Sequence, residues 1–227
     1  MVALLFLVRH GQASFGQANY DQLSTLGRQQ SRWLGEYFAA RGVIFTRAVV
    51  GTLVRQRDTA SEILSGMGVA TLVDTHAGLN EYNGEALYAK FTDGRDVLAH
   101  QKSDYRGYWR TLKTAMHAWA DGSLTGDFET WAEFGERTRT ALQTATTGLG
   151  REDAALVVSS GGAISRALID ILGCPGAMAV EFNLQFRNTG VCELIVGSDA
   201  TRLVTFNALP HLDRPESAER LKAITHA

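Results

Sequence analysis

The sequence has little cysteine, little net charge and no long apolar run, and each absence excludes a class of protein. Its two cysteines, Cys174 and Cys192, lie far apart without the spacing of a metal site, so we expect buried, reduced thiols. The net charge of −2 offers no basic surface for nucleic acid. The apolar run 2–8 is too short to span a membrane and lacks the basic start and cleavage site of a signal peptide. We therefore expect a cytoplasmic protein with neither nucleic acid nor membrane as partner.

Repeats, linkers and low-complexity tracts are also lacking, so the 227 residues predict one domain, 1–227. Apolar, β-branched runs alternate with helical patterns, which predicts a mostly parallel central sheet covered on both faces, a three-layer α/β/α sandwich. The expected strands are 2–8, 46–50, 70–73, 154–159, 191–196 and 202–206, and the expected helices are 26–41, 53–64, 130–147 and 163–172. The last two strands form a hairpin that places an antiparallel strand at one edge, and an exposed edge would permit dimers.

The segment from about 85 to 127 differs from the rest because it has no strand signal and many aromatic residues among polar ones. These aromatic residues are Tyr88, Tyr105, Tyr108, Trp109 and Trp119. We expect a helical insertion that caps the carboxyl edge of the sheet. The aromatic side chains are expected to form the core of this cap rather than a ligand site.

Two of the predicted strands end in cationic groups. The first ends in Arg9-His10-Gly11, which brings a guanidinium and an imidazole to the edge where open α/β sheets bind ligands. Gly11 allows a sharp turn close to a bound anion. Arg55 begins the helix after the second strand, where a cation is unfavourable unless an anion lies nearby. The structural alternative for each is an ordinary surface side chain.

Two further segments point to the same edge. Glu81 lies on a loop after the third strand, and shielding from water would raise its pKa and let it donate a proton. The fourth strand runs through Ser160, Gly161 and Gly162 into a helix, and such a turn can cradle a phosphate group. A loop glutamate alone has no special role, so the prediction depends on all four segments together.

The order and spacing of these segments resemble the histidine phosphatase superfamily, which includes phosphoglycerate mutases and many broad phosphatases. The matching stretches are 7–13, 23–27, 53–60, 79–81, 157–162 and the tail 207–212. They span nearly the whole chain apart from the cap segment.

The resemblance implies a role for each residue. His10 would be the nucleophile that becomes phosphohistidine, and Glu81 the proton donor that later activates water. Arg9 and Arg55 would hold the phosphoryl oxygens, with Ser160 and Gly161 completing the phosphate site. The guanidinium groups would supply the positive charge, so neither a metal nor another cofactor is expected.

The chain departs from the family pattern where a second histidine normally precedes the Gly-Gly pair, because Ser160 stands there. A neutral hydroxyl gives a hydrogen bond of roughly half the strength of a charged donor. Losing one preorganised donor costs about 2.7–4 kcal/mol of transition-state stabilisation. His76, His100, His117 and His211 are possible replacements, of which His211 is the best placed.

The chain departs from the family pattern at two other places. Gly16 replaces a polar residue often found six positions after the nucleophile, and Gln17 or Asn19 are its possible substitutes. The Glu-Arg-x-Tyr-Gly run of phosphoglycerate mutases is absent, because Tyr82-Asn83-Gly84 follow Glu81. We therefore do not expect high mutase activity.

Two functions remain open from the sequence. The first is a phosphomonoesterase of weakened activity that acts on a small phosphorylated substrate through His10. The second is a module that binds a phosphate ester or phosphoprotein and has lost turnover. A proton donor at Glu81 favours the enzyme, because a binder needs none, whereas Ser160 favours the binder.

Overall fold

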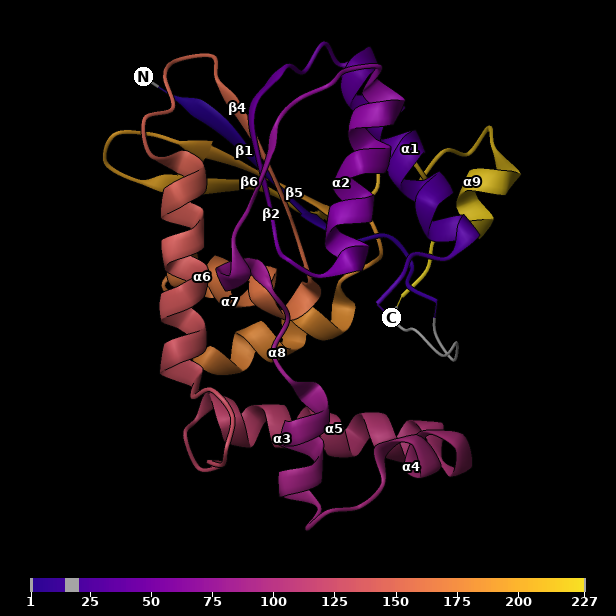
Figure 1. The fold of residues 1–227 in the computed structure, drawn as a ribbon, viewed down its shortest axis with the longest axis vertical. Helices are drawn as coiled ribbons and strands as arrows, with labels where there is room; N and C mark the ends of the chain where they lie inside the picture. The colour runs from indigo at the N-terminus through magenta and orange to yellow at the C-terminus, as the bar shows by residue number, and fades with distance from the viewer. Residues whose placement is uncertain (1, 15–20, 227) are drawn as a thin grey trace.

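The computed structural model describes residues 2–14 and 21–226 and shows one mixed sheet with helices on both faces (Figure 1). The strand order is β3-β2-β4-β1-β5-β6. The four parallel strands are β1 (Ala3–Arg9), β2 (Phe45–Val50), β3 (Val73–Thr75) and β4 (Ala154–Ser159). Strand β5 (Val191–Val196) is antiparallel to β1, and the edge strand β6 (Thr201–Ala208) is antiparallel to β5. The predicted α/β fold is confirmed.

The central strands are buried on both sides, which is why their sequences are apolar without a polar alternation. Phe6 and Val8 of β1 pack against α1 (Thr25–Ala40) and α2 (Val54–Met67). Leu5 and Leu7, which point the other way along the strand, pack with residues of α6 (Trp131–Thr146) and α7 (Gly161–Leu172). Because Arg9 is level with Ser159 and Val50 with Val158, strands β1, β2 and β4 end side by side.

Three expectations about local structure need correction. Strand β3 begins at Val73 instead of residue 70 and is three exposed residues long, so little apolar burial marked it in the sequence. Two helices were not predicted: α8 (Gly176–Gln185), whose apolar residues do not gather on one face, and the short α9 (Ala218–Lys222). Cys192 is buried as expected, but Cys174 is only partly buried because it lies in the turn after α7.

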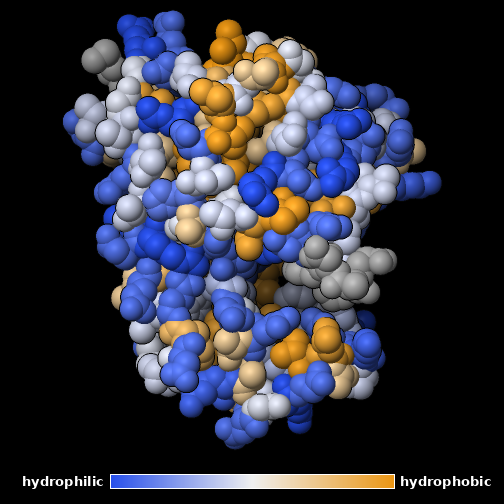
Figure 2. All heavy atoms as spheres, in the orientation of Figure 1, coloured by the Kyte–Doolittle hydropathy of each residue, from blue (hydrophilic) through white to orange (hydrophobic). Residues whose placement is uncertain are grey.

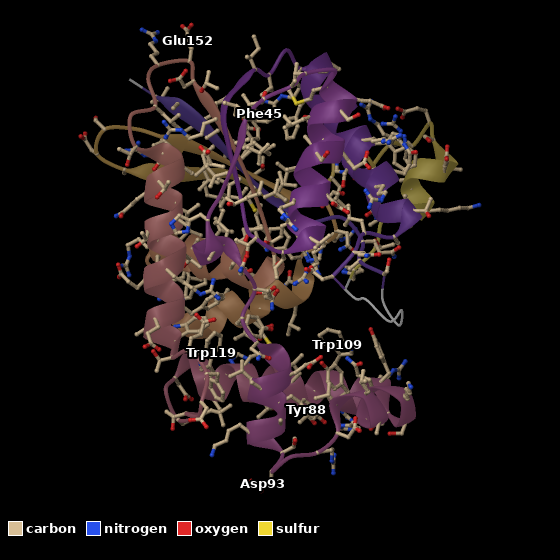
Figure 3. All side chains as sticks on the ribbon, in the orientation of Figure 1. Phe45, Tyr88, Asp93, Trp109, Trp119 and Glu152 are labelled. Atoms are coloured by element: carbon tan, nitrogen blue, oxygen red, sulfur yellow. The ribbon has the colours of Figure 1, made fainter. Side chains whose placement is uncertain are left out.

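Residues 85–127 lie beyond the carboxyl ends of the parallel strands and hold α3 (Gly84–Phe91), α4 (Val97–Ser103) and α5 (Tyr105–Ala120) (Figure 1). Figure 2 shows a hollow between these helices and the body of the molecule. Tyr88 and Tyr108 are buried against one another, and Trp119 stacks on Phe134 of α6. Figure 3 labels Tyr88 and Trp119 in this part of the molecule. Tyr105 is the exception, because half of its surface is exposed.

Candidate active site

His10 follows the last residue of β1 and is almost completely buried. Its Nδ1 atom lies 2.8 Å from the Gly11 carbonyl oxygen, which can only accept a hydrogen bond, so Nδ1 carries the proton. Burial, reinforced by the charges of Arg9 and Arg55, holds the pKa of His10 well below its ordinary value. The ring is therefore neutral at pH 7, with its lone pair on Nε2.

Arg55 lies in the first turn of α2 and donates from Nε to His10 Nε2 at 3.2 Å. Asp21 holds the other side of this guanidinium, 2.8 Å from Nη1, and accepts hydrogen bonds from the Val54 and Arg55 N–H groups. An anion was expected near the start of this helix, and the Asp21 carboxylate supplies part of that negative charge. It offsets the helix dipole and turns the guanidinium toward the imidazole.

Arg9 ends β1 and donates from Nη1 to the Phe186 carbonyl, at the end of α8. Its side chain also approaches the start of α7, because a Cβ on Gly161 would lie 3.6 Å from Arg9 Nε. Gly161 is therefore close to a guanidinium, as a phosphate-binding position requires.

Glu81 follows the 3₁₀ helix η1 (Ala77–Leu79) and is held by backbone donors. Its carboxylate accepts from the Gly162 N–H at 3.0 Å and from the Tyr82 N–H at 3.3 Å. A Cβ at position 162 would lie 2.3 Å from Glu81 Oε1, so only glycine lets the carboxylate approach this closely. In this arrangement the Gly162 N–H, which we expected to face phosphate, faces Glu81.

The environment of Glu81 shifts its acidity in the direction that a proton donor needs. Burial raises the pKa of Glu81, and the Gly162 hydrogen bond and the charges of Arg55 and Arg9 oppose this only in part. The same two arginines also act on His10. Arg9, His10, Arg55 and Glu81 therefore share one electrostatic environment at the carboxyl ends of the strands.

Ser160 lies at the N-cap position of α7 and is fully buried, but its hydroxyl does not cap the helix. Instead its Oγ accepts a hydrogen bond of 2.9 Å from Gln56 Nε2. Gln56 follows Arg55 on α2, and nothing in the sequence singled it out. The structure therefore brings Ser160 to the site, but in contact with an unpredicted partner.

Each of the four other histidines considered as replacements has a partner of its own. His211 is fully buried, with Nε2 2.8 Å from Thr189 Oγ1, and the Thr189 N–H in turn donates to the His10 carbonyl. His211 thus supports the backbone of His10 indirectly, through Thr189. The remaining three have the following partners: His76 Nδ1 accepts from Gly78 N, His100 contacts the Tyr88 hydroxyl, and His117 lies 3.4 Å from Glu181. The alternatives Gly16, Gln17 and Asn19 lie outside the described residues.

Sequence reasoning also missed the contacts behind Glu81. The Tyr82 hydroxyl accepts from Asn183 Nδ2 at 3.3 Å, and Asn183 Oδ1 approaches Gly161. Asn183 belongs to the unpredicted helix α8, so no pattern connected it to the site. Asp21 could have been found only as the acidic residue nearest the motif at 23–27.

The model of the histidine phosphatase superfamily, branch 1, matches residues 5–209, which include Arg9, His10, Arg55, Glu81 and Ser160. The chain belongs to this superfamily. Among curated relatives, the phosphoglycerate mutase of Methylorubrum populi that depends on 2,3-bisphosphoglycerate is 30% identical over 52% of the chain. A mutase of the same description from Afipia carboxidovorans is 29% identical over 51%. The chain covers 54% of the length of each of these relatives, about half.

Several solved structures share the fold over 92% of this chain at low identity. YhfR of Bacillus stearothermophilus has a TM-score of 0.68 at 16% identity, with 98% of that chain covered. A phosphoserine phosphatase of Entamoeba histolytica, in complex with 3-phosphoglyceric acid, has a TM-score of 0.66 at 19% identity and 99% coverage. A mycobacterial glucosyl-3-phosphoglycerate phosphatase has 0.65 at 23% identity and 100% coverage.

Among the described residues, no helix is both long and apolar enough to cross a bilayer.

Proposed function

We propose that this superfamily member is a phosphomonoesterase that acts through a phosphohistidine at His10. The observation that supports this most directly is the state of the imidazole. The Gly11 carbonyl fixes the proton on Nδ1, and burial keeps the ring neutral, so Nε2 carries a lone pair beside the Arg55 guanidinium. A neutral nitrogen nucleophile next to a phosphate-binding cation is what attack on phosphorus requires.

In the first step, the Nε2 lone pair of His10 forms a bond to phosphorus while the bond from phosphorus to the ester oxygen breaks. Arg55 releases Nε2 and, with Arg9, binds the oxygens of the transferring group. The leaving oxygen takes the proton of Glu81, because burial raises the pKa of that carboxyl and so favours its protonated form. The products are an alcohol and a phosphorylated His10.

In the second step, water attacks phosphorus and the bond to Nε2 breaks. The Glu81 carboxylate formed in the first step takes a proton from this water, so the enzyme returns to its starting protonation state. Inorganic phosphate then leaves, and the Nε2 lone pair is restored. The positive charge that transfer needs comes from Arg9 and Arg55, so we propose that the reaction is independent of metal.

We propose hydrolysis rather than mutase activity, although curated relatives are mutases. The turn after Glu81 is occupied by structural contacts: the Tyr82 ring packs against Trp119 and Phe134, and Asn83 caps α3. None of the three described residues of this turn, Tyr82, Asn83 and Gly84, carries a cationic group of the kind that would recognise a glycerate carboxylate. The proposed substrate is a small phosphorylated molecule that enters between the sheet and the cap, and the proposed location is the cytoplasm, consistent with two free thiols.

The test compares hydrolysis of p-nitrophenyl phosphate, at mildly acidic pH and with EDTA present, by the wild-type protein and His10→Ala. His117→Ala, which removes a histidine of the cap that contacts Glu181, is the matched control. We expect turnover and an acid-labile phosphoenzyme in the wild type and in the control, and neither in His10→Ala. Equal background turnover in all three proteins would instead support the impaired binding module. The presence of Ser160 in place of a cationic donor favours that alternative.

A further inference from the structure

Gln56 is a fully buried amide directly beside the phosphate site, and its contacts fix the orientation of its side chain. One of its terminal atoms lies 3.0 Å from the Leu79 carbonyl oxygen. Since a carbonyl only accepts, this atom is Nε2 and carries the protons. The other terminal atom, Oε1, lies against Gly51, where a Cβ would come within 1.8 Å of it.

The same Nε2 atom donates its second proton to Ser160 Oγ at 2.9 Å. The Ser160 hydroxyl is therefore an acceptor toward Gln56, and its own proton points elsewhere. In residues 2–14 and 21–226, no hydrogen bond uses this proton, although the side chain is fully buried. The neighbouring Ser159, by contrast, donates its hydroxyl proton to the Leu79 carbonyl oxygen at 2.6 Å.

A buried hydroxyl proton normally has an acceptor, so the surroundings of Ser160 indicate where an acceptor for its proton would bind. Ser160 precedes Gly161 at the start of α7, and Arg9 Nε lies 3.6 Å from where a Gly161 Cβ would be. An anion held by Arg9 at this helix start would be within reach of the Ser160 hydroxyl.

We propose that Gln56 is a positioning residue that turns the Ser160 hydroxyl into a fixed donor to the phosphoryl group. The proposal rests on the phosphate site proposed above. Arg55 and Gln56 are consecutive on α2, so one turn of helix supplies both a cation for the phosphoryl group and the side chain that orients a second donor to it. Gln56 itself does not touch the substrate.

The experiment measures the Kd of orthovanadate for the wild type, Ser160→Ala, Gln56→Met and the double variant, by isothermal titration calorimetry at pH 7. Loss of a hydrogen bond to a charged ligand in Ser160→Ala weakens binding by about tenfold. Gln56→Met keeps the volume of the side chain but frees the hydroxyl to occupy three staggered positions, which weakens binding by about threefold. Because Gln56 acts only through Ser160, the double variant should bind as Ser160→Ala does.

Ser165→Ala is the matched control, since Ser165 is another fully buried serine on α7 whose hydroxyl has no hydrogen-bond partner among the described residues. It should leave the vanadate Kd unchanged. Thermal unfolding identifies variants that do not fold, and Gln56→Leu replaces Gln56→Met if needed. The proposal is overturned if the Gln56 variant binds like the wild type, or if it weakens binding equally in the Ser160→Ala background.

This readout separates the two proposals, because vanadate binding does not require turnover. If His10→Ala and the wild type are equally inactive but the cycle shows coupling, the phosphomonoesterase proposal fails and the role of Gln56 stands. If turnover depends on His10 but Gln56 and Ser160 act independently, only the role of Gln56 fails.

Discussion

Restoring an imidazole at position 160 is the most informative perturbation of this site. From the sequence alone, Ser160→His should raise the rate, because it supplies a charged donor in place of a neutral one. The structure changes this expectation, since Gln56 Nε2 lies only 2.9 Å from Ser160 Oγ and both side chains are fully buried. An imidazole extends several atoms beyond the position of Oγ, so along the rotamer of Ser160 it would overlap the Gln56 amide.

The magnitudes follow from packing and from donor strength. Overpacking a buried site costs about 1–3 kcal/mol, so Ser160→His alone should unfold at a lower temperature than the wild type and should not be faster. Gln56→Ala removes the amide group and makes room for the ring. In the double variant the imidazole can reach the phosphoryl group, and one preorganised donor is worth about 2.7–4 kcal/mol, or on the order of a hundred- to a thousandfold in kcat.

The assay is steady-state hydrolysis of p-nitrophenyl phosphate by the four proteins of this cycle, together with thermal unfolding of each. We expect the order of kcat to be Ser160→His/Gln56→Ala above wild type, and wild type above both single variants. A faster, equally stable Ser160→His would show that Gln56 does not fill this space. A double variant that folds but is slower than the wild type would refute the view that Ser160 is a weakened donor.

Two further predictions concern pH. The acid limb of kcat/KM should reflect protonation of His10, whose pKa is lowered, and the alkaline limb should reflect deprotonation of Glu81, whose pKa is raised. Glu81→Gln should therefore remove the alkaline limb. An alkaline limb that persists in that variant would assign this limb to another group. Burial lowers the pKa of His211 from 6.5 to about 3. Between these two pH values His211 binds a proton in the unfolded state but not in the folded state, so the free energy of unfolding falls as the pH drops from 6.5 toward 3. Urea unfolding of His211→Gln at pH 7 and 5 should show a smaller loss than the wild type, by about 2 kcal/mol at most; an unchanged loss would contradict this assignment.

The sequence predicted the central strands and the four main helices because their signals are local. Strand β4 runs over the predicted residues 154–159, and α7 ends at Leu172 as predicted, where Gly173 adopts a left-handed conformation. Strand β3 and helix α8 were placed wrongly or missed because the first buries little apolar surface and the second has no single apolar face. Their formation depends on neighbours that a sequence window does not contain.

The same distinction applies to the site. Arg9, His10 and Arg55 could be located because the ends of parallel strands meet at one edge of a sheet. Gln56 could not, since its role arises from contacts with Leu79 and Ser160, which lie far from it in the chain. The direction of the Gly162 N–H toward Glu81 was likewise invisible, because it depends on how the loop after η1 folds back onto α7.

The choice between an enzyme and a binding module turns on the two titratable groups that the site shifts in opposite directions. Burial lowers the pKa of His10 and raises that of Glu81, so the site favours the base without its proton and the acid with one. A module that only binds phosphate gains nothing from this, because a protonated histidine would attract the anion more strongly than a neutral one. Keeping a neutral histidine between two arginines reduces the attraction for the anion, and this loss is explained if the lone pair on Nε2 is needed for bond formation.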